Sequence, residues 1–79
     1  MLKCLITDKA GNILRSCIVV DEAHARLQLL DDGAHVHILP NEAGRIADEK
    51  LMVVKGVLTA KPGVTEKVQH TGMKVTPLR

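Results

Sequence analysis

The sequence predicts a mainly β or small α+β fold with two β-hairpins, a third strand, a short helix and an extended C-terminal tail. Two pairs of apolar, β-prone segments each flank a short turn with glycine, and residues 62–79 are mostly polar. With 79 residues and no Phe, Tyr or Trp, we expect one domain with a thin aliphatic core. Such a core favours a small module that completes its burial against a partner over an enzyme with a deep pocket.

The first hairpin is predicted from two apolar segments, residues 2–7 and 13–20. Between them, Asp8 can accept hydrogen bonds from the turn backbone, and Gly11 can adopt the positive φ that a type I turn closed by a bulge requires. Asp8 and Gly11 are therefore the predicted turn-forming residues.

A short helix and a third strand are predicted next. Asp21 is a good N-cap for the helix-forming residues 22–30. Residues 34–39 then alternate with a period of two, which predicts a half-buried strand with His35 and His37 on one face.

The second hairpin is predicted from residues 51–54 and 57–60, with Lys55 and Gly56 forming its turn. Residues 1–61 are then one small hairpin module, and residues 62–79 form a C-terminal arm. The arm has no core-facing pattern, so we expect it to become ordered only on a partner. The apolar arm residues expected to bind that partner are Val64, Val68, Met73, Val75 and Leu78.

The charge pattern argues against nucleic-acid recognition. The chain has 11 Lys and Arg against 9 Asp and Glu, and the net charge of +2 arises in residues 62–79. A nucleic-acid-binding surface needs a clustered basic face, usually with aromatic rings. The apolar runs are also far shorter than the roughly 20 residues of a membrane-spanning helix, and we expect no small-molecule substrate, cofactor or membrane partner.

Metal binding and cysteine chemistry are the remaining alternatives. His35 and His37, with His24, Cys4 or Cys17, have the side chains of a zinc site but not its usual spacing. Exposed histidines and free buried thiols are the favoured interpretation. Cys4 and Cys17 lie on the two arms of one hairpin, but the sequence does not fix their register. For catalysis by a cysteine with a histidine base, the sequence offers no residue to orient the histidine and no oxyanion-hole motif. We therefore do not expect an enzyme.

Several short segments resemble small tail proteins of tailed bacteriophages, found near tail-fibre and baseplate genes. The resemblance covers the apolar–Asp–Gly–apolar hairpin of residues 5–16, the Leu-Gln pair at 27–28, and the second hairpin, which closes on Lys61 and Pro62. Where those proteins usually carry a tyrosine before the second turn, this chain has Met52 and Val53. The resemblance implies a virion structural component with no catalytic residues, which acts by binding other tail or capsid proteins.

The sequence thus predicts a non-enzymatic bacteriophage virion protein, associated with the tail or capsid and made in the host cytoplasm. Unpaired strand edges of a small hairpin module can add strands from another chain. We therefore expect assembly through strand edges and the C-terminal arm, with other virion proteins and with copies of itself. The alternative is a small cytosolic regulatory or nucleic-acid-binding β-barrel that uses the basic tail.

Overall fold

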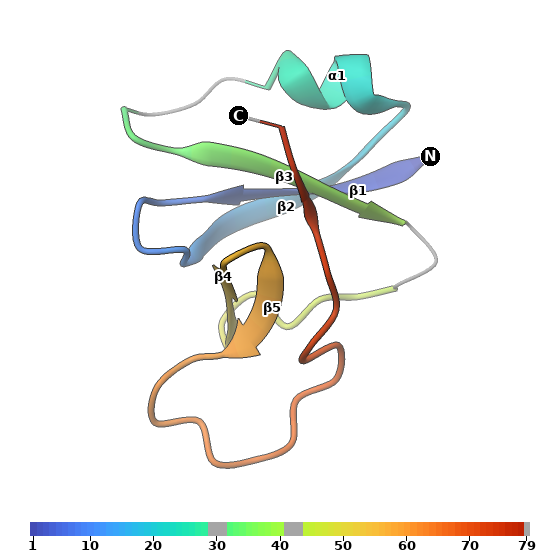
Figure 1. The fold of residues 1–79 in the computed structure, drawn as a ribbon. Helices are drawn as coiled ribbons and strands as arrows, with labels where there is room; N and C mark the ends of the chain where they lie inside the picture. Colours follow the sequence, from blue (N-terminus) through green and yellow to red (C-terminus); the bar gives the residue numbers. More distant parts are fainter. Residues whose placement is uncertain (29–31, 41–43, 79) are drawn as a thin grey trace.

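The computed structural model describes residues 1–28, 32–40 and 44–78. In this part of the chain the structure is mainly β, with one short helix, which confirms the predicted fold class. The elements, shown in Figure 1, are β1 (Leu2–Thr7), β2 (Ile13–Val19), α1 (Glu22–Arg26), β3 (His35–Pro40), β4 (Leu51–Val54), β5 (Val57–Ala60) and β6 (Thr76–Pro77).

The described strands form two antiparallel sheets. The larger sheet has the order β2-β1-β3-β6, and β4 pairs with β5. In β1, Cys4, Leu5 and Ile6 are all buried. Successive side chains of a strand point to opposite faces, so the larger sheet carries buried apolar side chains on both faces.

Each face of the larger sheet is covered by a different element. In Figure 1, α1 lies over one face and the β4–β5 hairpin lies beyond the other. The α1 side packs the buried residues Cys4, Ile6, Val19, Ala25 and Val36. The opposite side packs the buried residues Leu5, Ile13, Leu39, Ile46, Leu51, Val53, Leu58, Val68 and Val75. The molecule is therefore a three-layer structure with two small aliphatic cores.

The first hairpin turn has the geometry that its sequence predicts. The carboxylate of Asp8 accepts hydrogen bonds of 2.9 Å from the backbone N–H groups of Ala10 and Asn12. The N–H of Gly11 donates to the carbonyl of Asp8, and Gly11 has a φ of 92°. The pairing of β1 with β2 shifts between Ile6 and Thr7, which is the bulge that such a turn requires.

The second hairpin turn uses two residues with positive φ. Lys55 has a φ of 53° and Gly56 a φ of 77°. Positive φ at both central residues is the pattern of a type I′ turn, whose twist matches that of the two strands it joins.

The helix begins where its cap predicts. Asp21 is extended, and its carboxylate accepts a 2.9 Å hydrogen bond from the N–H of His24. Glu22 and Arg26 form an exposed ion pair one turn apart. The helix is shorter than predicted, since Leu27 is its C-cap. Residues 29 and 30 of the predicted helix lie outside the described residues.

The third strand differs from its prediction. It was expected to be half-buried, but β3 has buried residues facing both sides of the sheet, Val36 in one core and Leu39 in the other. The reason is the β4–β5 hairpin, which covers the face on which exposed histidines were expected. His35 is exposed, whereas His37 is only 9% exposed.

The C-terminal segment also differs from its prediction, because it is ordered on its own chain. The N–H of Leu58 donates to the carbonyl of Met73, and that of Gly72 donates to the carbonyl of Leu58. β6 pairs with β3, and the N–H of Leu78 donates to the carbonyl of Val36. The sequence pattern missed this packing because single apolar residues in an irregular segment can each fill a gap in a core without any periodicity.

Candidate functional site

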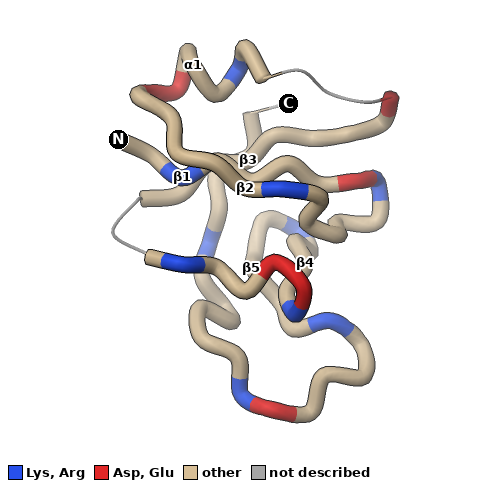
Figure 2. Tube along the Cα trace, turned by 180° about the vertical axis from the view of Figure 1, so that it is seen from behind, with Lys and Arg blue, Asp and Glu red and all other residues tan. Residues whose placement is uncertain are grey.

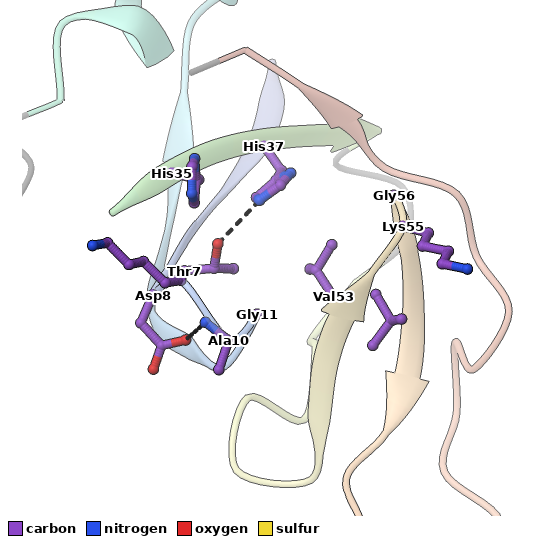
Figure 3. Close-up of a pocket in the computed structure, with 11 residues that line it drawn as sticks. Thr7, Asp8, Ala10, Gly11, His35, His37, Val53, Lys55 and Gly56 are labelled. Atoms are coloured by element: carbon purple, nitrogen blue, oxygen red, sulfur yellow. Dashed lines mark hydrogen bonds between the residues drawn. The ribbon is translucent and has the colours of Figure 1, made fainter. Parts of the chain in front are cut away.

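A surface pocket of about 300 Å³ lies where three elements meet. The turn between β1 and β2, the start of β3 and the turn between β4 and β5 line it (Figure 3). All four predicted turn-forming residues, Asp8, Gly11, Lys55 and Gly56, line this pocket together with His35 and His37. The sequence did not predict that the two hairpin turns come together.

His37 is the buried titratable group beside the pocket. Its Nε2 shares a 3.0 Å hydrogen bond with Oγ1 of the buried Thr7 (Figure 3). Its Nδ1 is buried without a hydrogen-bond partner among the described residues. Burial, and secondarily the nearby His35, lower the pKa of His37 below its ordinary value. The ring is therefore neutral at pH 7, and its hydrogen bond to Thr7 joins β3 to β1.

The carboxylate of Asp8 is committed to its turn. It accepts hydrogen bonds from two backbone N–H groups and from Nδ2 of Asn12. These bonds, led by that from the Asn12 side chain, lower the pKa of Asp8. A carboxylate held ionised in this way stabilises a turn but is a poor proton donor near neutral pH.

The pocket therefore offers a neutral, hydrogen-bonded histidine and an ionised turn carboxylate. The carboxylate of Asp8 and Nε2 of His37 are engaged in hydrogen bonds within the fold, and the two side chains make no nucleophile–base pair among the described residues of the pocket. This geometry gives no support to acid–base or nucleophilic catalysis at this site.

The buried state of His37 predicts a pH-dependent stability. A histidine whose pKa is lower in the folded than in the unfolded chain contributes stability that is complete above the unfolded value of 6.5. That stability falls as the pH drops below this value, because the unfolded chain binds the proton more readily. We expect the urea midpoint to decrease between about pH 7 and about pH 5. The free energy of unfolding should fall through this residue by at most about 1.4 kcal/mol per pH unit.

The variant His37→Gln should flatten this pH dependence, since glutamine does not titrate and can still hydrogen-bond to Thr7. The variant His35→Gln is the matched control. It removes the smaller cause of the shift and should keep most of the slope. Equal slopes for the parent and His37→Gln would show that other groups cause the pH dependence.

The structure does not bring the candidate zinc ligands together. Cys4 lies opposite Ile38 and Cys17, whereas His37 lies opposite Leu5. Because alternate residues of a strand point to opposite faces, the two cysteines lie on the α1 side of the sheet, and His35 and His37 lie on the other. The described residues contain no cluster of three or more metal-ligating side chains.

The two cysteines are free and directly opposed. Cys4 is buried, Cys17 is half-buried, and they occupy partner positions in the β1–β2 ladder. Burial, followed by the neighbouring Cys17, raises the pKa of Cys4 to about 12. The sequence alone does not fix this register, which in the structure includes a shift between Ile6 and Thr7.

The C-terminal arm residues lie within the protein's own packing. Val68 and Val75 belong to the core on the hairpin side, with Val64 and Met73 packed against it. Leu78 packs against the core on the α1 side. These five side chains were expected to bind a partner, but in the structure they cover the two hairpins of their own chain.

The outer edge of β2 is the candidate interaction surface. Among the described strands β2 pairs only with β1, so alternate backbone groups of a seven-residue strand face outward. Leu14 is 53% exposed and Ile18 is 44% exposed on this strand, and Val20 just beyond it is 62% exposed. Exposed apolar residues on an unpaired edge are typical of a surface that adds a strand from another chain.

Charged residues are dispersed over the molecule. Figure 2 shows Lys and Arg interspersed with Asp and Glu along the trace. Lys50 pairs with Glu66 at 2.8 Å, and this contact raises the pKa of Lys50. Along the described part of the trace, basic residues are thus separated by other residues and do not form one continuous run.

Comparisons with known proteins give no relative. No protein-family model matches the chain, and neither the curated proteins nor the solved structures contain a match. Within the described residues, no helix has the length and apolar character needed to cross a membrane.

Proposed function

We propose that this protein is a non-enzymatic structural component of a bacteriophage virion, associated with the tail or capsid, that assembles through the outer edge of β2. The free, apolar edge of β2 is the observation that supports an assembly role. The resemblance of the two hairpin segments to small phage tail proteins supports the assignment to a virion.

Among the described strands, the edges of β3, β4 and β5 are at least partly covered within the chain, whereas β2 is the longest strand with an open edge. β6 covers part of the outer edge of β3, and the segment around Gly72 and Met73 bonds to β5. On the other side of the hairpin, Val53 donates a 2.7 Å hydrogen bond to the carbonyl of Gly11. Covered edges do not accept a further strand, so the C-terminal arm acts by protecting edges rather than by binding a partner.

The sequence of β2 suits pairing with a second copy of itself. In an antiparallel pair related by a two-fold axis through Ser16, Leu14 of each copy lies opposite Ile18 of the other. Arg15 then lies opposite Cys17, so the two arginines are not directly opposed. The exposed apolar residues thus meet each other across the axis, and the two arginines do not.

Replacing Ile18 with lysine should weaken this association at least about tenfold, because each interface would bury two new charges beside an apolar residue. Light scattering over a range of protein concentrations measures the change as a shift from dimer or higher oligomer to monomer. Val54→Lys is the matched control, since Val54 is 40% exposed and lies on β4 away from the β2 edge. A parent chain that stays monomeric, or equal weakening by the control, would contradict the role of β2.

The virion assignment and the nucleic-acid alternative need their own measurements. A virion component should appear in peptide mass spectra of purified phage particles in stoichiometric amounts. A nucleic-acid-binding protein should instead bind DNA with an affinity that falls steeply as salt rises. Assembly through an apolar strand edge should be nearly insensitive to salt.

A further inference from the structure

Cys4 and Cys17 occupy directly opposed positions on neighbouring antiparallel strands. Opposed residues share a face of the sheet, so both side chains lie on the α1 side. No disulfide joins them in the structure. The feature is therefore a pair of adjacent thiols and not an isolated cysteine.

The strand geometry suits a bond between them. Directly opposed residues of antiparallel strands have Cα atoms about 4.5 to 5.5 Å apart. Disulfides join residues whose Cα atoms are about 4.4 to 6.8 Å apart. Opposed residues have Cα separations inside this range whether or not they are hydrogen-bonded to each other. The strands β1 and β2 therefore need not move apart or slide for the two sulfurs to bond.

Access from solvent differs between the two thiols. Cys4 is completely buried, whereas Cys17 is half-buried on the edge strand. The thiol of Cys17 donates a weak hydrogen bond of 3.9 Å to Oε1 of Gln28, just beyond α1. A small oxidant that approaches the edge of the sheet therefore reaches Cys17 first.

We infer that Cys4 and Cys17 form a two-cysteine site at which a small disulfide oxidises the chain to an intramolecular disulfide. This inference depends on the register of β1 and β2 and on an open β2 edge, because the strand pairing proposed above would cover Cys17. It does not depend on the virion role. A chain that leaves a reducing cytoplasm would meet conditions that favour this reaction.

The reaction proceeds in two exchanges, written here for oxidised glutathione. The thiolate of Cys17 attacks one sulfur of glutathione disulfide, the sulfur–sulfur bond breaks, and one glutathione leaves as a thiolate that takes up a proton. Cys4 then loses its proton to solvent, and its sulfur attacks the sulfur of Cys17, which releases the second glutathione. Two protein thiols are oxidised, and one glutathione disulfide is reduced to two glutathione molecules.

The two variants have different expected products. Cys4→Ala should stop after the first exchange and retain glutathione on Cys17. Cys17→Ser should react at least about tenfold more slowly than the parent, because the remaining thiol is buried and its pKa is raised. The parent should pass briefly through the glutathione adduct and end without it.

The experiment incubates the folded chain with oxidised glutathione, blocks remaining thiols with an alkylating agent, and records the intact mass without reductant. We expect a monomer that has lost two hydrogens, carries no glutathione and takes up no alkylating agent. A parent that keeps glutathione, becomes linked between chains, or stays fully alkylated would overturn the inference. The transient adduct in the parent keeps the test valid even where Cys4→Ala does not fold.

Discussion

Replacing Gly11 with alanine is expected to lower the free energy of unfolding by about 3 to 5 kcal/mol. Gly11 has a φ of 92°, and a Cβ built there would lie 2.0 Å from the carbonyl oxygen of Val53. The left-handed conformation costs an alanine about 1 to 2 kcal/mol, and the clash with backbone must be relieved by moving the second hairpin away from the first. That movement also weakens the 2.7 Å hydrogen bond from Val53 to Gly11.

Gly72→Ala separates these two causes. Gly72 has the same φ of 92°, but a Cβ there would have nothing within 4 Å. In this control the free energy of unfolding should fall only by the cost of the left-handed conformation, about 1 to 2 kcal/mol. Urea unfolding followed by circular dichroism measures both variants. Equal losses would show that the contact between Gly11 and Val53 contributes little to stability.

The turns and the helix start could be predicted because local chemistry determines them. Asp8 and Gly11 form the first turn as their sequence indicates, and Lys55 and Gly56 form the second. Asp21 caps α1 through the backbone of His24. In each case the determining feature is either a side chain that bonds to backbone within four residues of itself or a residue that adopts a positive φ, so it can be recognised in the local sequence.

The candidate surfaces could not be predicted in the same way, because they depend on contacts between distant segments. His37 was expected to face solvent, and it is buried because the β4–β5 hairpin covers that face. The opposition of Cys4 and Cys17 depends on the register of β1 and β2, and a one-residue difference in register would place them on opposite faces. The free edge of β2 was expected only as one of several edges, since the pairing order was not known.

The same reasoning applies to the C-terminal segment, whose apolar residues have no period. A period arises when a regular element presents one face to a core, but Val68 and Val75 reach the core from irregular backbone. Thr76 and Pro77 add a short strand to β3 only because the earlier contacts bring them there. A polar segment with scattered apolar residues is therefore not by itself a sign of an arm that waits for a partner.

Replacing Val75 with aspartate should lower the free energy of unfolding by about 3 kcal/mol or more. Val75 is 7% exposed in the hairpin-side core, and its N–H donates a 2.8 Å hydrogen bond to the carbonyl of Gly56. A carboxylate there would lose its hydration without gaining a partner. The loss is large beside the roughly 4 to 12 kcal/mol expected for a chain of this size.

Thr76→Asp is the matched control, because Thr76 is the next residue and is exposed. A loss within about 0.5 kcal/mol is expected for this surface position, again measured by urea unfolding. Protonating the carboxylate at Val75→Asp should restore part of the stability at low pH, because the neutral acid is less costly to bury. If Val75→Asp were as stable as Thr76→Asp, the segment would not be packed on its own chain in solution. The expectation that the segment becomes ordered only on a partner would then hold. The C-terminal arm would be a second candidate assembly surface in addition to the edge of β2.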